Sequence, residues 1–277
     1  MRLDVWNALF VGLVTAAAAF ALVSAVRSRA GTWRWWGVPA LLGGWALTVG
    51  VVTSRLDELG EEGSLSAHVA QHVVLGDLAA PLLLLGVSPA LGAALDRGYA
   101  RLARSDHALG RIAMLGLSPI GAALIWAGMT YLWLVPSLHR LAIPAGPVHA
   151  LDHASFLGFG LLVWLAAFDF RRVAPVDTWD ALLAALRTGD LPWWGRHVYA
   201  MATRFLMLPA ILMLWLMPSA AYFLPGQLPP GGLTRHEDQV QAASLMLGFE
   251  ILLFALSLIL LFVFAAVSEG RRREQAQ

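Results

Sequence analysis

The stretch "SAHVAQHVVLGDLAAPLLLLG", residues 66–86, decides how this chain folds. It is apolar through most of its length and long enough to cross the hydrocarbon core of a bilayer as one helix. It nevertheless begins with His68 and His72, one helical turn apart, and carries Asp77 further along. Because a carboxylate inside a membrane is costly unless it is paired or protonated, these side chains need partners within the protein.

The composition extends this interpretation to the whole chain. Of the 277 residues, 58% are hydrophobic and only 13% are charged, and the mean hydropathy is +0.67. A soluble domain carries about a quarter charged residues. Since apolar blocks of roughly twenty residues recur throughout, we expect an all-α, polytopic transmembrane bundle in membrane lipid, forming a single domain over residues 1–277. No nucleic-acid partner is expected.

Two missing residue types exclude several chemistries. The chain has no cysteine, which excludes disulfides, thiolate zinc sites and iron–sulfur clusters. All 19 basic residues are arginines, so a lysine Schiff base of the retinal type is excluded as well.

Seven membrane spans are predicted. The first is expected to be a retained helix rather than a signal peptide, because it lacks a strongly basic start and a small-residue cleavage pattern. The spans cover approximately residues 5–26, 35–53, 66–86, 112–135, 148–170, 199–224 and 240–267.

The arginines predict the orientation of the bundle. Fourteen of them fall after the first, third and fifth spans or in the C-terminal tail, and four fall on the opposite side. The positive-inside rule therefore places the N-terminus outside and the C-terminus in the cytoplasm. The outer segment 55–63 is acidic, and the long cytoplasmic loop before the sixth span is expected to hold an interfacial helix, with Trp193 and Trp194 at the headgroup level.

Six of the eight histidines then map to the outer ends of spans three to seven: His68, His72, His139, His149, His153 and His236. Two pairs in the spans, His68/His72 and His149/His153, have i,i+4 spacing, which puts both imidazoles on one helix face. Two such pairs at the same depth favour a metal or haem site with up to four ligands. The other two, in loops, are interpreted as structural residues, with at most an auxiliary role.

Four acidic residues are auxiliary candidates. Asp152 and Asp77 could orient an imidazole ligand by hydrogen bonding. Asp77 and Glu250, both deep in spans, could equally form a helix–helix contact or a proton relay, with Arg204 as the most obvious partner charge. Asp238 lies in the acidic turn before the seventh span.

Imidazole ligands without thiolates suit copper, zinc or haem iron. Three methionines are expected in the outer half of their spans, Met129, Met217 and Met246, and thioethers there would favour Cu(I). Haem would need two axial imidazoles on facing helices, which His72 with His149 or His153 could supply. The residues alone leave these alternatives open.

Four blocks of the chain resemble the CtaG-like family, the multi-span assembly factors of caa-type cytochrome c oxidases. In order they are "SAHVAQHVVLGDLAAPLLLLGVSPAL" (66–91), "LWLVPSLHRLAI" (132–143), "VHALDHASFLGFGLLVW" (148–164) and "EDQVQAASLMLGFE" (237–250). The resemblance covers spans three to seven. Three positions depart from the family pattern: Leu134 replaces a histidine, Asp152 replaces a glutamate, and Ala242–Ala243 replace a glycine pair.

The resemblance implies a non-enzymatic role in maturing the copper centre of the oxidase, in a bacterial plasma membrane. It implies that copper is bound on the outer side, and the positions that carry over are His68, His72, His149 and His153. A site that hands copper to an oxidase subunit is expected to be exposed and incompletely coordinated. The alternatives are a bis-histidine haem protein for electron transfer and, ranked lower, a copper or proton transporter using Asp77, Arg204 and Glu250.

Overall fold

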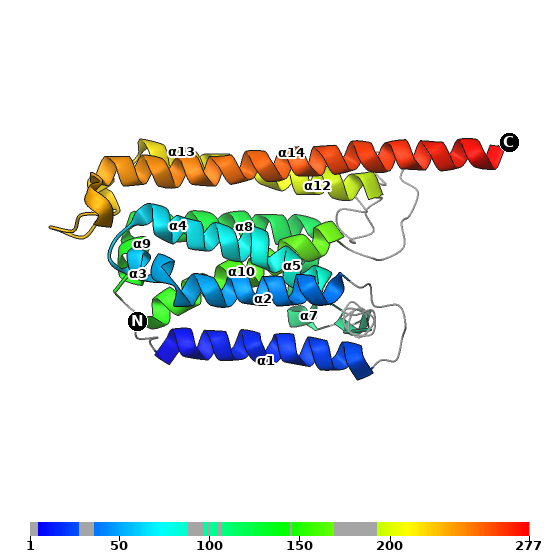
Figure 1. Cartoon of the computed structure of the whole chain (residues 1–277), viewed down its shortest axis with the longest axis horizontal. Coiled ribbons are helices and arrows are strands. Elements are labelled where there is room, and N and C mark those ends of the chain that lie inside the picture. Colours follow the sequence, from blue (N-terminus) through cyan, green and yellow to red (C-terminus); the bar gives the residue numbers. More distant parts are fainter. Residues whose placement is uncertain are drawn as a thin grey trace.

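The computed structural model of the chain describes residues 5–27, 36–87, 97–98, 100–102, 104, 107–144, 146–168 and 193–276. All regular elements within these residues are helices, which confirms the all-helical prediction. Figure 1 shows the long helices lying side by side, with α1 (Val5–Arg27) and α2 (Gly37–Thr53) at one edge and α14 (Arg235–Ala276) at the other.

Five spans among the described residues are long and apolar enough to cross a membrane, and seven result if two bent helix pairs each count as one. The five are Val5–Ser24, Leu65–Leu85, Gly146–Phe168, Trp194–Leu216 and Arg235–Val267. Large apolar side chains on the outside of the bundle, such as Leu13 (71% exposed) and Phe262 (65%), would face lipid, because water would penalise them. The chain is therefore a membrane protein.

The third span contains an irregular turn. Helix α4 (Leu65–Val73) leads into the π-helical turn η1 (Val74–Ala79) and then α5 (Ala80–Leu85). The Gly76 carbonyl within this turn accepts a hydrogen bond of 3.0 Å from the indole of Trp164 on α10 (Gly146–Phe168). A side chain from a neighbouring helix thus stabilises the irregular backbone at Gly76, and such turns frequently mark functional sites.

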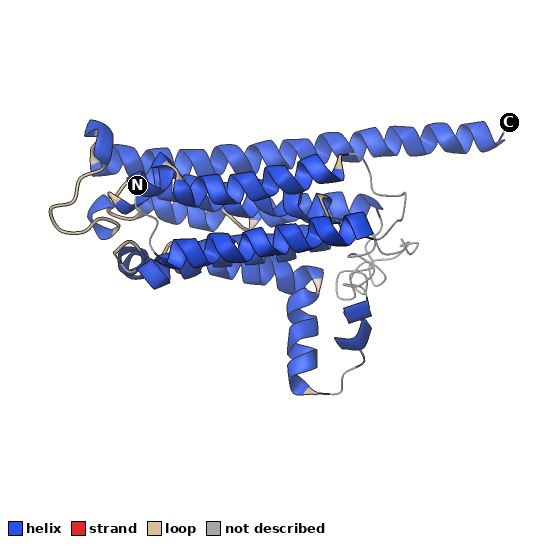
Figure 2. Cartoon of the chain, turned by 60° about the horizontal axis from the view of Figure 1, so that its bottom comes forward, coloured by secondary structure: helices blue, strands red, loops and turns tan. Residues whose placement is uncertain are grey.

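The fourth and sixth spans differ from the predicted ranges. Helices α7 (Ala108–Leu117) and α8 (Pro119–Trp133) meet at an 80° bend rather than forming one straight span, and α7 projects from the bundle (Figure 2). The sixth span comprises α12 (Trp193–Phe205) and α13 (Leu208–Leu216). It ends earlier than predicted because Pro218 and the short turn η2 (Ser219–Ala221) follow it.

Two segments predicted as loops are helical. The acidic segment forms α3 (Arg55–Glu61), where Ser54 caps the first turn by accepting a hydrogen bond from the Leu56 amide and acidic residues complement the helix dipole. The segment after α8 forms α9 (Pro136–Ala142), and a short 3₁₀ turn, η3 (Pro230–Gly232), precedes α14. The interfacial helix expected before the sixth span lies outside the described residues; Trp193 and Trp194 begin α12.

We call one end of the bundle the histidine end; it contains α3, α9 and the first turns of α4, α10 and α14 (Figure 1). Asp238 of α14 joins α14 to the first turn of α4. Its carboxylate accepts hydrogen bonds from the amides of Leu65 (2.6 Å) and Ser66 (3.2 Å). A carboxylate at a helix N-terminus satisfies free amides and complements the dipole. Asp238 is thus a cap between two spans.

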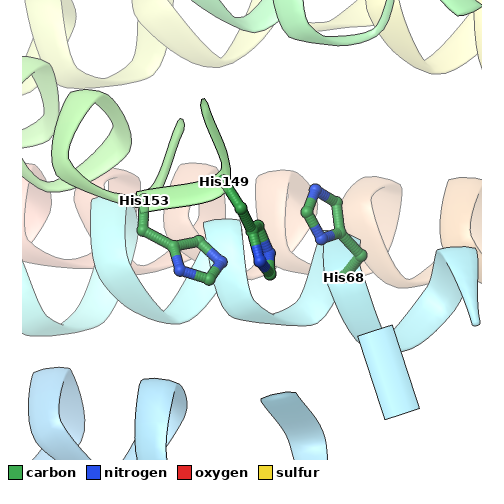
Figure 3. A group of neighbouring side chains, drawn as sticks. All are labelled: His68, His149 and His153. Carbon is green, nitrogen blue, oxygen red and sulfur yellow. The ribbon is translucent and has the colours of Figure 1, made fainter. Parts of the chain in front are cut away.

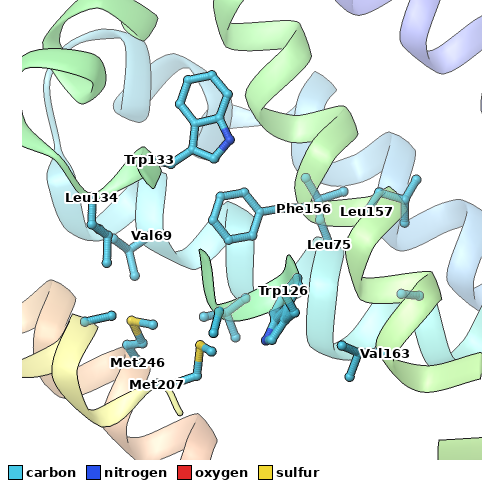
Figure 4. Close-up of a cluster of buried hydrophobic side chains, with 14 of the residues drawn as sticks. Val69, Leu75, Trp126, Trp133, Leu134, Phe156, Leu157, Val163, Met207 and Met246 are labelled. Atoms are coloured by element: carbon cyan, nitrogen blue, oxygen red, sulfur yellow. The ribbon is translucent and has the colours of Figure 1, made fainter. Parts of the chain in front are cut away.

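A cluster of buried apolar side chains packs between the helices of the bundle (Figure 4). Its aromatic residues include Trp126, Trp133 and Phe156, and the thioethers of Met207 and Met246 lie near one another at its edge. Close helix packing within it depends on Gly76, because a Cβ there would overlap with the Trp126 ring.

Substituting Gly160 with alanine is expected to destabilise the bundle by about 1–3 kcal/mol, because the new Cβ would lie 2.8 Å from the Gly76 backbone. Gly158→Ala on the same helix is the control, since a Cβ there meets nothing within 4 Å. Thermal unfolding of the purified protein in detergent measures both effects. Equal melting temperatures for the two variants would contradict this packing.

Candidate metal centre

The two histidine pairs predicted from the sequence come together at the histidine end. His68 and His72 lie on α4, and His149 and His153 lie on α10. Within each pair the ring centroids are 4.3 Å apart, as i,i+4 spacing on one face predicts. Across the two helices, the ring of His149 stacks on that of His68 at 5.2 Å and lies between His68 and His153 (Figure 3).

All four imidazoles are buried, with exposed fractions from 0% for His153 to 6% for His72. This differs from the expected exposed transfer site. At this end of the bundle α3 packs against α4, and α9 packs against α10, where the sequence predicts loops. Any ion that reaches these rings must therefore pass between side chains rather than bind at an open surface.

Asp152 connects the two helices. Its Oδ2 lies 3.0 Å from Nε2 of His68 and 3.0 Å from Nε2 of His72. Each imidazole can donate its Nε2–H to this oxygen, which leaves Nδ1 as the nitrogen with a free lone pair. The sequence suggested Asp152 as a residue that orients an imidazole, and its position suits that role.

Several polar atoms in the site have no hydrogen-bond partner among the described residues. They include both ring nitrogens of His153, Nδ1 of His68 and Oδ1 of Asp152. A buried polar atom without a partner costs about 1–3 kcal/mol. These atoms are therefore candidates for contact with a bound ion.

Two groups of ligand atoms are close enough to bind one metal ion. Within His68, His149 and His153 the nitrogens lie within 4.8 Å of one another, and the same holds for His68, His72 and Asp152. Ligands about 2 Å from one ion lie up to about 4 Å apart, so small ring rotations would complete the first group. The donor set fits a metal ion that prefers imidazole.

A fifth histidine, His139, joins the cluster from α9. It is 3% exposed, and its ring centroid lies 5.0 Å from that of His68. Burial, and then the nearby His68, lowers the pKa of His139 well below its usual range, so the ring is neutral at pH 7. His236 is exposed in the first turn of α14 and lies apart. We call His68, His72, His139, His149 and His153 the histidine cluster.

Sequence reasoning did not single out Glu61, at the C-terminal end of α3. Its Oε1 lies 3.9 Å from Nδ1 of His149, and its side chain is 46% exposed. The acidic run at residues 55–63 was the available signal, but composition does not tell which carboxylate points inward. Glu61 therefore lies at the protein surface and also close to His149 of the buried histidine cluster.

Asp77 and Glu250 lie deeper in the bundle and pair with Arg204. Nη1 of Arg204 is 2.7 Å from Oδ1 of Asp77 and 3.3 Å from Oε2 of Glu250. Arg204, the partner charge that the sequence predicts, therefore lies at the same depth as the two carboxylates. We call these three residues the buried triad.

A small cavity lies between the histidine cluster and the buried triad. It has room for about one water molecule. His72 lines it, and its ring stacks at 3.8 Å on that of Phe156, another lining residue. The remaining lining includes Asp77, Glu250, Leu134, Met207 and Met246.

Of the three methionines singled out in the sequence, only Met246 lines this cavity. Met129 packs against the apolar core, and Met217 is partly exposed.

The chain was compared with known proteins. No curated protein and no solved structure matched it. The family model described as cytochrome c oxidase caa3 assembly factor matches residues 18–266, which is most of the chain and includes every residue of the histidine cluster. The chain therefore belongs to the cytochrome c oxidase caa3 assembly factor family.

Proposed function

We propose that this protein binds a copper ion in the histidine cluster and delivers it to the copper-containing subunit of a cytochrome c oxidase during assembly. The protein acts without catalysing a reaction, and copper is its cargo. The observation that carries the proposal is the group of unpartnered nitrogens on His68 and His153, buried beside His149. A family role in oxidase assembly supplies the recipient.

The donor atoms favour copper. His68, His149 and His153 provide imidazoles, and the chain has no thiolate that would select zinc or an iron–sulfur cluster. Copper binds imidazole more tightly than the other divalent first-row metals do. Asp152 holds His68 and His72 in place, in the manner of a carboxylate that orients ligands from behind.

Access to the site is proposed to run past Glu61. This carboxylate is partly exposed and lies 3.9 Å from His149, so it can attract a cation and pass it to the first imidazole. The arginine distribution supports an outward-facing histidine end in a bacterial plasma membrane, with the C-terminus in the cytoplasm. Release then requires a small movement of the covering helices, triggered by contact with the oxidase subunit.

A haem function finds less support. Within the described part of the chain, the cross-helix imidazole centroids lie only 5.2–5.9 Å apart, with the rings of His68 and His149 stacked directly on each other. The cavity beside His72 accommodates about one water molecule rather than a porphyrin.

Replacing His153 with alanine is expected to remove most of the bound copper, because His153 presents two unpartnered nitrogens to the site. His236→Ala is the matched control, since this histidine lies at the same end but is exposed. Metal content per purified chain, after incubation with copper and removal of excess, gives the answer. If both variants keep the copper content of the unmodified protein, the proposed site is incorrect.

Asp152→Asn is expected to weaken copper binding about 10–100-fold without abolishing it. The amide keeps the size of the carboxylate but cannot accept a hydrogen bond with a full negative charge from His68 and His72. A competition titration with a chelator of known copper affinity measures the change. An unchanged affinity would show that Asp152 serves only to join the two helices.

Deleting the gene is expected to leave the cell with an oxidase that lacks copper and has little activity. Expression of the unmodified protein or His236→Ala should restore activity, whereas His149→Gln should not, because His149 lies between His68 and His153. Oxygen consumption and oxidase copper content are measured in isolated membranes. Full oxidase activity in the deletion strain would refute the assembly role.

A further inference from the structure

The buried triad joins three separate elements of the bundle. Arg204 comes from α12, Asp77 from the π-helical turn η1, and Glu250 from the first half of α14. Each side chain is at most 6% exposed. Trp164 covers the guanidinium of Arg204, whose central carbon lies 5.6 Å from the centre of the indole ring. The triad is therefore shielded from water on this side.

The formal charges of the triad do not balance. Two ionised carboxylates and one guanidinium give a net charge of −1 in the interior of a membrane protein, where an uncompensated charge is strongly unfavourable. The other titratable groups facing Glu250 from the elements packed on α14 are His72 of α4 across the cavity and Tyr199 of α12 beside Arg204. Helix α13 contributes none. Neither side chain carries a permanent positive charge that would balance the second carboxylate.

The geometry distinguishes the two carboxylates. Asp77 accepts a hydrogen bond of 2.7 Å from Nη1 of Arg204, as expected of an ionised partner. Oε2 of Glu250 is 3.3 Å from the same nitrogen, and it accepts no hydrogen bond from any residue that the structure describes. An oxygen in that position can carry a proton. Glu250 is thus the member of the triad that would be neutral.

We propose that Glu250 binds one exchangeable proton that neutralises the buried triad, and that a metal cation in the histidine cluster displaces this proton. The cavity supplies the connection, since Glu250, Asp77 and His72 all line it and it can hold a water molecule. His72 lies on one side of this cavity, and Asp77 and Glu250 also line it. Across a space that holds about one water molecule in a protein interior, charges on the two sides interact appreciably.

The exchange offsets one unit of the positive charge that the incoming cation brings. A cation enters the histidine cluster, the O–H bond of the Glu250 carboxyl group breaks, and the proton leaves through the cavity water to the bulk solvent. The positive charge in the buried region then rises by less than the full charge of the ion. The displacement of this proton by a metal cation rests on the proposed copper site, whereas the protonation of Glu250 does not.

The test is infrared difference spectroscopy of the full-length protein in lipid nanodiscs, without metal. A protonated carboxyl group gives a carbonyl band that a carboxylate lacks. The spectrum of the unmodified protein minus that of Glu250→Gln is expected to contain this band. Its absence would overturn the proposal.

Asp77→Asn tests the charge balance directly. With Asp77 neutral, Glu250 becomes the sole counter-charge of Arg204 and is expected to lose its proton, so the carboxyl band disappears although Glu250 is present. A band that persists in Asp77→Asn would show that burial alone protonates Glu250, and would refute the balance argument. Glu62→Gln, at an exposed position, is the control and leaves the band unchanged. Melting curves establish that each variant is folded.

The displacement is tested by adding Cu(I) or Ag(I) to the unmodified protein and to His153→Ala. The carboxyl band is expected to decrease as metal binds to the unmodified protein, and to stay constant in His153→Ala. If metal binds and the band does not change, the displacement is refuted. If no metal binds, the proposed copper function fails, while the band without metal still decides whether Glu250 is protonated.

Discussion

The hydrogen bonds from His68 and His72 to one oxygen of Asp152 determine the arrangement of the histidine end. They join α4 to α10 at the depth where both histidine pairs lie, and they set which nitrogen of each ring is free. The other hydrogen bond between these two spans among the described residues runs from Trp164 to the Gly76 carbonyl, deeper in the bundle, so Asp152 fixes their relative rotation at the level of the histidines. The stacking of His149 on His68 follows from that rotation.

The buried triad is another polar contact of the bundle interior, and it lies at the irregular turn of the third span. In η1 the backbone departs from α-helical pairing, Trp164 satisfies the Gly76 carbonyl, and Asp77 pairs with Arg204. The cavity lies between this contact and the histidine cluster. A membrane protein that moves a cation between helices must compensate charge locally, because lipid cannot do so. His72 of the histidine cluster and Asp77 and Glu250 of the buried triad line the same cavity.

Much of the fold could be predicted from the sequence. Apolar length located the first, third, fifth and seventh spans, because the bilayer sets the length of a helix that crosses it. The bend at Ser118–Pro119, the early end of the sixth span and the helix at residues 55–61 could not be obtained in this way. Hydropathy averages over a window, whereas these features depend on single caps and prolines.

The sequence by itself determined that the chain spans a membrane several times and that His68, His72, His149 and His153 form two pairs, since helical spacing and burial in lipid follow from residue order alone. Only the tertiary structure decided that the pairs meet, that His139 joins them while His236 does not, and that Arg204 lies between two carboxylates. The physical reason is that contacts between helices depend on rotation and depth, which residue spacing within one helix does not specify.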